Sequence, residues 1–175
     1  MIHHCCRPFE TGQDEAGEKI DNCCAPLQAS MDRTAAVTQS NRCPTCGQKG
    51  KKVERLTLKV MLEVSLLAIR DVSYLFCRTA ECSVVYFSAD GTQSFTKEQI
   101  RVPVYQKEPN DESVLVCYCF YHGPAAIRAE LSATDRSTVI EEINRGIQAG
   151  QCACEIRNPQ GTCCLGNLSV LVKQS

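Results

Sequence analysis

The chain has 175 residues, of which 43% are hydrophobic, enough for the core of one medium domain or two small ones. Its formal net charge is −1, and it contains no Trp, five Phe and five Tyr. This composition excludes the basic surface and the aromatic platform of a single-strand binder, so we expect no nucleic-acid partner.

Cysteine is the residue type that stands out, with 14 copies. Residues 1–8 have no apolar core of signal-peptide length, and no run of eighteen apolar residues could span a membrane. We therefore predict a cytoplasmic protein with reduced thiols and no membrane span. In that compartment, clustered cysteines are metal ligands more often than disulfides.

Residues 1–42 are polar and show little periodicity, which predicts a mobile tail. The tail carries soft ligands in pairs: His3, His4, Cys5, Cys6, Cys23 and Cys24. Such pairs suit Cu(I) or another thiophilic ion such as Zn or Hg. The alternative interpretation is a polar tail in which the cysteines are incidental.

Two cysteine pairs follow, and their spacing indicates a tetrahedral thiolate site. They are Cys43 with Cys46 (Cys-x2-Cys) and Cys77 with Cys82 (Cys-x4-Cys). Gly47 lets the backbone bend after the first pair, so that amides can face the sulfurs. Four soft thiolates without an open position favour structural zinc. The alternative is two unrelated loop pairs.

The elements around these pairs are short. Strands are predicted for four segments rich in β-branched and aromatic residues: residues 73–76, 83–87, 94–96 and 100–105. The first two would enter and leave the Cys77–Cys82 loop as a metal-clipped hairpin, and Pro103 would confine the last to a sheet edge. Residues 56–69 are apolar and could form a strand followed by a short helix, which periodicity does not settle.

Residues 106–113 are charged and contain Pro109, so we place a domain boundary there. A helix is predicted to begin near Pro124, and a second one at Thr134 and Asp135 that Gly150 ends. Residues 165–172 are apolar enough for a closing strand or helical turn.

The predicted helical hairpin has cysteines at both ends: Cys117, Cys119, Cys152, Cys154, Cys163 and Cys164. A hairpin returns the chain to its start, so the two groups of thiols should meet. A Cys-x-Cys pair forms a poor internal disulfide because its ring is small. Iron–sulfur clusters need four thiolates, commonly from two places in the chain, and this stretch offers that arrangement.

Two blocks of motifs occur between residues 43 and 175: Cys43-Pro-x-Cys46 with Phe76-Cys77-x4-Cys82-x-Val84-Val85-Tyr86-Phe87, and Val116-Cys117-Tyr118-Cys119 with Cys154-x3-Asn158-Pro159-x-Gly161-x-Cys163-Cys164. In this order they resemble the N-terminal part of the archaeal CopZ-type copper chaperones. That part combines a zinc-binding domain with a 2Fe–2S domain similar to bacterioferritin-associated ferredoxin.

The resemblance implies a zinc ion on Cys43, Cys46, Cys77 and Cys82 and a 2Fe–2S cluster on Cys117, Cys119, Cys154 and Cys164. Cys154 is chosen because the family's third cluster ligand stands four residues before the Asn-Pro pair. Cys163 competes with Cys164 for the last position. Cys152 is then an extra thiol, either a spare ligand or a small buried residue.

The expected fold class is α+β. Residues 1–42 would be the mobile tail, residues 43–112 a small zinc-clipped β-rich domain, and residues 113–175 a helical-hairpin 2Fe–2S domain similar to bacterioferritin-associated ferredoxin.

The expected function is zinc and 2Fe–2S binding in copper or heavy-metal homeostasis, with one-electron transfer or Cu(II) reduction. A heavy-metal transport ATPase or another metal-resistance protein is the expected partner. The family's C-terminal heavy-metal-associated domain, with its Met-x-Cys-x-x-Cys motif, is not found in this sequence, so we do not expect copper delivery through it. The sequence has no Gly-rich phosphate loop and no nucleophile elbow, so enzymatic activity beyond redox is not predicted. The alternative is a metal-stabilised adaptor without redox turnover.

Overall fold

The computed structural model describes residues 40–174, which belong to one compact unit. The tail's paired soft ligands lie outside the described residues. The first half contains β1 (Lys51–Val53), α1 (Arg55–Met61), η1 (Leu66–Ala68), β2 (Tyr74–Phe76), β3 (Val84–Ser88), β4 (Ser94–Thr96) and η2 (Lys97–Gln99). The second half contains α2 (Pro124–Thr134), α3 (Val139–Gln148), α4 (Cys154–Arg157) and α5 (Leu165–Gln174). The predicted α+β class is confirmed.

The strands form one antiparallel sheet in the order β1-β2-β3-β4. β2 and β3 make the predicted hairpin, with Leu75 opposite Phe87, and the Cys77–Cys82 loop lies between them. Both faces of this hairpin are covered, because Tyr74 and Phe76 join the core that contains α1 whereas Leu75 joins the core beside the cysteines. Alternation along the strand therefore buries apolar side chains on both sides of the sheet.

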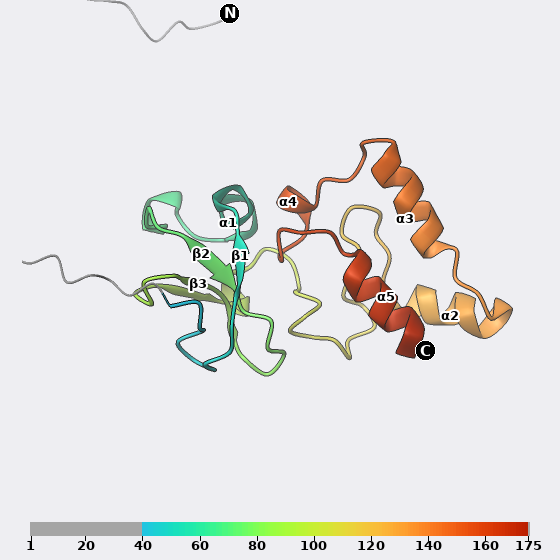
Figure 1. Ribbon diagram of the computed structural model, residues 1–175, viewed down its shortest axis with the longest axis horizontal. Coiled ribbons are helices and arrows are strands. Elements are labelled where there is room, and N and C mark those ends of the chain that lie inside the picture. The colour runs from blue at the N-terminus through green and yellow to red at the C-terminus, as the bar shows by residue number, and fades with distance from the viewer. Residues whose placement is uncertain (1–39, 175) are drawn as a thin grey trace, which may run out of the picture. The chain divides into compact units, whose positions relative to one another are not determined.

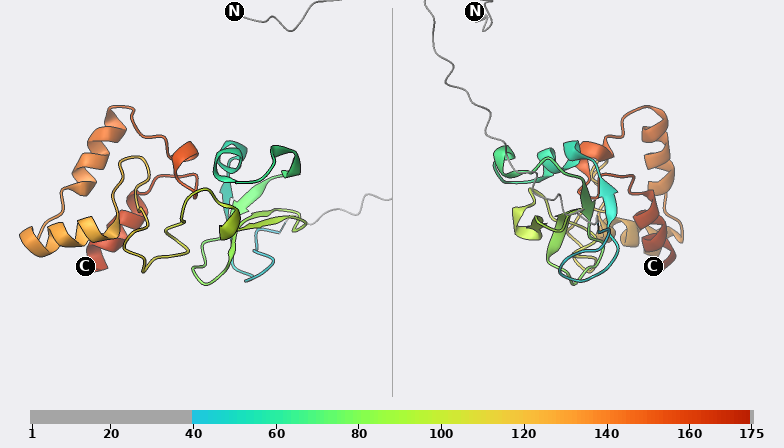
Figure 2. Two further views of the ribbon diagram at one scale, coloured as in Figure 1. Left: turned by 180° about the vertical axis from the view of Figure 1, so that it is seen from behind. Right: turned by 60° about the vertical axis from the view of Figure 1, so that its left-hand side comes forward.

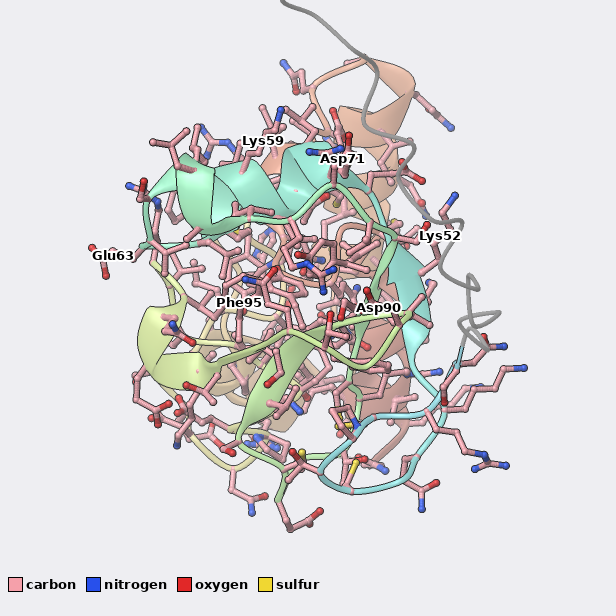
Figure 3. All side chains as sticks on the ribbon, turned by 90° about the vertical axis from the view of Figure 1, so that its left-hand side faces the viewer. Lys52, Lys59, Glu63, Asp71, Asp90 and Phe95 are labelled. Carbon is pink, nitrogen blue, oxygen red and sulfur yellow. The ribbon has the colours of Figure 1, made fainter. Side chains whose placement is uncertain are left out.

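α1 covers one face of the sheet (Figure 1). Its residues Leu58 and Met61, with Leu62 just beyond its end, are buried at the spacing of one helical face. Figure 3 shows Phe95 of β4 in the interior below this helix, while Lys59 and Glu63 point outward. The apolar segment 56–69 thus becomes a helix and a 3-10 turn, and the strand considered for its start does not form.

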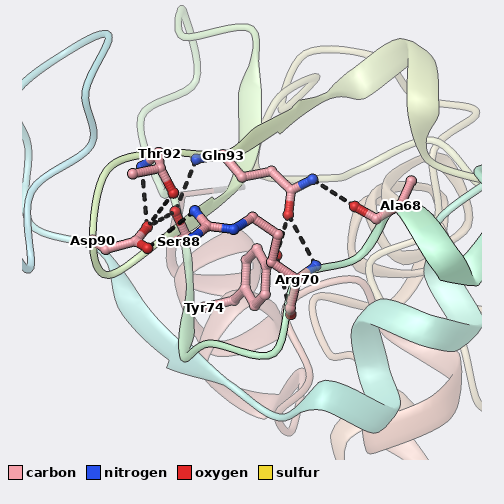
Figure 4. A network of polar contacts seen from close by, with 7 residues as sticks. All are labelled: Ala68, Arg70, Tyr74, Ser88, Asp90, Thr92 and Gln93. Carbon is pink, nitrogen blue, oxygen red and sulfur yellow. Dashed lines mark hydrogen bonds and ion pairs between the residues drawn. The ribbon is translucent and has the colours of Figure 1, made fainter. Parts of the chain in front are cut away.

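The loop before β2 is tied to the turn between β3 and β4 by the polar network in Figure 4. Arg70 pairs with the Asp90 carboxylate at 3.1 Å, and the Gln93 side-chain amide donates to the Ala68 carbonyl at 2.7 Å. Asp90 and Gly91 form the turn between β3 and β4, with Gly91 at a φ of +70°. These contacts fix the end of the β2–β3 hairpin that lies opposite the Cys77–Cys82 loop.

Residues 100–105 do not form the predicted strand. Ile100 makes only an isolated bridge with Leu62, and the Arg101 amide donates to the carbonyl of Met61. The chain has turned from the sheet toward the end of α1 at this point, and Pro103 has no amide hydrogen to extend a ladder.

The helices of the second half begin and end at identifiable signals. α2 begins with Pro124 as predicted, but it continues through Thr134, and Asp135 caps it in the left-handed conformation at a φ of 55°. The predicted start of the second helix at Thr134 and Asp135 is therefore wrong, because these residues end α2. α3 begins only at Val139, and Gly150, at a φ of +69°, follows its end as predicted.

Residues 165–172, predicted as a strand or helical turn, belong to the full helix α5. Both α2 and α3 pack against α5 (Figures 1 and 2). Ile127, Ile143 and Leu168, one from each helix, are among the fully buried side chains of this core. α2 and α3, which lie between Cys119 and Cys152 in the sequence, thus pack on the same third helix.

The segment after α4 contacts the first half of the chain. α4 packs against α1, and the Thr57 hydroxyl donates to the Glu155 carbonyl at 2.7 Å. The Tyr86 hydroxyl donates to the carbonyl of Pro159. Gly161 lies so close to α1 that a β-carbon there would stand 2.9 Å from the Thr57 hydroxyl oxygen. The domain boundary between residues 112 and 113 therefore stays a prediction within one compact unit.

Substituting Gly161 tests this contact. Gly161→Ala should lower the free energy of unfolding by more than Gly91→Ala, because both glycines have a φ near +70° but only Gly161 has neighbours within 4 Å. The shared cost of the left-handed backbone is about 1–2 kcal/mol. Urea unfolding of both variants measures the difference, and equal losses would show that the Gly161 contact does not form.

Candidate metal centres

The first candidate centre consists of four cysteine sulfurs. The sulfurs of Cys43, Cys46, Cys77 and Cys82 all lie within 4.8 Å of one another. Cys43 and Cys82 are 3.8 Å apart, and Cys46 and Cys77 are 3.6 Å apart. Zn–S bonds of about 2.3 Å in a tetrahedron place the sulfurs about 3.8 Å apart. These residues therefore fit a zinc ion by ligand type, number and spacing.

A tight turn and a hairpin loop bring these sulfurs together. The amide of Gly47 donates to the Cys43 carbonyl at 2.9 Å, and the φ of +70° at Gly47 allows this reversal. The β2–β3 hairpin carries Cys77 and Cys82 at the two ends of its loop. Strand pairing thus fixes one pair of ligands, and a local turn fixes the other.

The acidity of the thiols shows why the site needs a cation. Burial raises the pKa of Cys82 to about 12. Burial also disfavours the thiolate of Cys46, but hydrogen bonds from the Thr79 hydroxyl and the Gln48 amide outweigh it and lower the pKa to about 6. The four sulfurs cannot all be thiolates near neutral pH unless a cation replaces their protons.

Lys107, in the predicted linker, reaches this centre. Its side chain is buried, and its ammonium donates to the carbonyl of Thr79 at 2.7 Å. The hydroxyl of Thr79 lies 3.4 Å from the Cys46 sulfur. A positive charge near four thiolates offsets their excess negative charge. No local sequence signal predicts this contact, because Lys107 lies 28 residues from Thr79.

The second candidate centre contains three sulfurs in mutual contact. The sulfurs of Cys119, Cys152 and Cys154 lie within 4.8 Å of one another. The distances are 3.7 Å for Cys119–Cys154, 3.4 Å for Cys152–Cys154 and 4.0 Å for Cys119–Cys152. The predicted meeting of the two ends of the helical segment is therefore observed.

Cys117 and Cys164 lie beside this group and are almost fully buried. Hydrogen bonding to Cys164 lowers the pKa of Cys117 to about 7 and the pKa of Cys154 to about 5, and it raises the pKa of Cys164 itself. Cys164 thus interacts with both Cys117 and Cys154. Cys163, the competitor, is exposed.

The loop that carries Cys117 and Cys119 is closed on itself. The amide of Cys117 donates to the His122 carbonyl at 3.0 Å, and the amide of His122 donates back at 3.2 Å. The Tyr118 hydroxyl anchors the loop to the first half, donating to the Pro103 carbonyl at 2.7 Å. From the other side, the amide of Ala153 donates to the sulfur of Cys119 at 3.4 Å.

These donors fit an iron–sulfur cluster by type and number. Cys117 and Cys164 belong to the core of the second half, Cys119 packs against this core, and Cys154 interacts with Cys164 and Cys119. The amide of Ala153 faces the Cys119 sulfur. Amide hydrogen bonds to the sulfurs are one of the features by which proteins tune such clusters. Cys152 adds a fifth thiol to the region.

All ten described cysteines are free thiols. No helix among residues 40–174 has the length and apolar character needed to cross a bilayer.

Comparison with known proteins places the first centre in a recognised module. Residues 40–101 match the zf_CopZ family, described as a zinc binding domain. The four cysteines of the first centre lie within this range, so the chain contains a zinc-binding domain of the CopZ type, and its cysteine cluster suits Zn²⁺.

The chain is also similar to the crystal structure of the N-terminal domain of CopZ from Archaeoglobus fulgidus. The sequence identity is 28% and the TM-score is 0.62, over 74% of this chain and 96% of the CopZ domain. No curated protein matches the sequence significantly. The similarity therefore extends beyond the zinc-binding domain into the second half.

Replacing Lys107 tests its contribution to the first centre. Lys107→Met should make zinc about tenfold easier to extract, because the loop carbonyl of Thr79 and the thiolates lose their nearby cation. Lys97→Met is the control, since Lys97 pairs with Glu108 at the surface. Competition with a zinc chelator measures retention, and equal retention in both variants would contradict this role of Lys107.

Proposed function

We propose that this chain is a zinc- and 2Fe–2S-binding protein of copper or heavy-metal homeostasis that transfers single electrons. The observation that carries the proposal is the presence of two separate groups of cysteine sulfurs, of which the first lies in a CopZ-type zinc-binding domain. The similarity to a CopZ N-terminal domain supports the connection to metal handling.

In this proposal the zinc is structural and is held by Cys43, Cys46, Cys77 and Cys82. Three of the four thiols are buried, and all four sulfurs are committed to one another, which leaves no open position for a substrate. Residues 43–112 would form the zinc-binding domain. Its strands have only three to five residues, so the metal would supply part of the folding free energy.

The cluster would be held by Cys117, Cys119, Cys154 and Cys164 in a domain of residues 113–175 similar to bacterioferritin-associated ferredoxin. A bound 2Fe–2S cluster supplies a centre that accepts and releases one electron. The chain's own part is to exclude water, with Cys117, Cys154 and Cys164 buried, and to direct amides such as that of Ala153 at the sulfurs.

A cluster on these ligands would lie near exposed side chains through which an electron could pass to a partner. Tyr121 is 69% exposed two residues after Cys119, and the guanidinium of Arg157 lies over its ring at 5.9 Å. A heavy-metal transport ATPase or another metal-resistance protein is the proposed partner, and the cytoplasm is the proposed location. Reduction of Cu(II) to Cu(I) is the proposed use of the electron.

The second candidate function is a metal-stabilised adaptor without redox turnover. The tight contact between the two halves, through Gly161 and Tyr86, favours it, because both metals could simply hold one compact structure. A reversible reduction potential and reoxidation by Cu(II) distinguish electron transfer from the adaptor.

Protein purified without oxygen should contain two irons, two acid-labile sulfides and one zinc per chain, since two separate groups of four thiolates are proposed as ligands. Metal analysis and a visible spectrum that dithionite bleaches would check this composition. Zinc without labile sulfide would refute the cluster and leave the zinc-binding domain standing.

Four single variants test the choice of cluster ligands. Cys154→Ala and Cys164→Ala should lose or severely destabilise the cluster. Cys163→Ala and Cys152→Ala should retain it, because Cys163 is exposed and Cys152 is in excess of the four thiolates that a cluster needs. Iron content and the visible spectrum report the result. A colourless Cys152→Ala variant beside a coloured Cys154→Ala variant would reverse the assignment.

A further inference from the structure

We propose that Cys119, Cys152 and Cys154 form a three-thiolate site for a single soft cation of low coordination number, with Cu(I) as its chemical type. The site goes beyond the proposed function and does not require the 2Fe–2S cluster, although it shares two sulfurs with it. The observation behind it is the grouping of these three sulfurs, which includes Cys152, a thiol that the proposed cluster does not need.

The sulfur spacing matches three ligands around one ion. With metal–sulfur bonds of about 2.3 Å, a planar three-sulfur site places its ligands about 4.0 Å apart, and a slightly pyramidal site places them a little closer together. The three observed distances are 3.4, 3.7 and 4.0 Å. A small shift of side chains would therefore suffice for all three sulfurs to contact one ion.

The backbone holds Cys152 in this position. It lies between α3, which ends at Gln148, and α4, which begins at Cys154. The next residue, Ala153, donates its amide to the sulfur of Cys119, and the amide of Cys154 faces the Cys152 sulfur. The two residues after Cys152 are thus held against the cysteines, and before it the amide of Gln151 donates to the Gly146 carbonyl at 2.9 Å, so the third sulfur is preorganised.

The donor set selects the kind of ion. Among the described residues, no histidine or carboxylate joins this group of sulfurs. Thiolates without oxygen or nitrogen ligands favour soft cations over hard ones, and Cu(I) is the soft first-row ion of this kind. Zinc prefers four ligands, which the first centre offers and this group of three does not.

Cu(I) binding at this site and binding of the 2Fe–2S cluster exclude each other, because they share two sulfurs. Cys119 and Cys154 cannot serve a cluster and a separate ion at once, so a chain with Cu(I) here has no intact four-ligand site for the cluster. Soft-metal binding at these sulfurs would therefore compete with cluster assembly, and Cys152 would decide how well it competes.

The test uses the full chain with Cys5, Cys6, Cys23 and Cys24 replaced by Ser, so that thiols of the tail do not bind the probe. Cys117→Ala and Cys164→Ala are added to remove two cluster ligands while leaving the three proposed sulfurs. Anaerobic titration with Cu(I) against a competing chelator should show one bound ion, without release of zinc.

Adding Cys152→Ser should weaken this binding by about tenfold or more, since even the loss of residues that only support a metal ligand costs that much. Adding Cys163→Ser should leave it unchanged, because Cys163 is exposed. Equal affinity in the Cys152→Ser and Cys163→Ser proteins, or Cu(I) binding only with zinc release, would overturn the proposal.

Loss of zinc and of secondary structure would reveal that the Cys117→Ala Cys164→Ala protein fails to fold. In that case the Cys152→Ser and Cys163→Ser variants are made in protein that keeps Cys117 and Cys164, and the cluster is removed chemically before the comparison. X-ray absorption should then count three sulfurs around Cu(I), and two in Cys152→Ser. A count unaffected by Cys152→Ser would refute the site. Absence of iron and labile sulfide from the untreated protein would refute the proposed cluster, and Cys152-dependent Cu(I) binding would still stand.

Discussion

Mutual repulsion between crowded thiolates is the constraint on which the rest of this structure depends. Four sulfurs within 4.8 Å of one another cannot all ionise in a buried site without a cation between them. Burial raises the pKa of Cys82 while hydrogen bonds lower that of Cys46, so without a metal the sulfurs hold protons unequally. A zinc ion on these sulfurs would remove this conflict and join the turn at Cys43 to the β2–β3 hairpin.

The same constraint acts in the second half with a different outcome. Five thiols gather around the end of the Cys117–His122 loop, one more than a four-ligand cluster needs. The first centre has a closed set of four ligands, which suits a permanent structural ion. The second has a surplus, which suits a site whose occupant can change.

The two halves are not independent. Lys107, in the charged segment between them, donates to the loop of the first centre, and the Tyr118 hydroxyl of the second centre's loop donates to Pro103. Gly161, in the motif that precedes Cys164, packs on Thr57 of α1. These contacts join the loops of the two centres within one compact unit.

The sequence by itself determined the elements whose signals are local. Cysteine spacing identified the two pairs of the first centre, β-branched and aromatic runs identified β2, β3 and β4, and Pro124 and Gly150 marked helix ends. Each of these signals depends on residues a few positions apart, so the amino-acid sequence is sufficient to predict the element. The α+β class followed from the same signals.

The tertiary structure decided what depends on distant partners. Residues 56–69 became helical because Leu58, Met61 and Leu62 could bury one face on the sheet, and residues 100–105 lost their strand because the chain there leaves the sheet for the end of α1. Which thiols meet was likewise decided by folding, since Cys119 and Cys152 lie 33 residues apart. The packing of α2 and α3 on α5 and the bond from the Ala153 amide to the Cys119 sulfur hold these parts of the chain together, and sequence spacing does not determine such contacts.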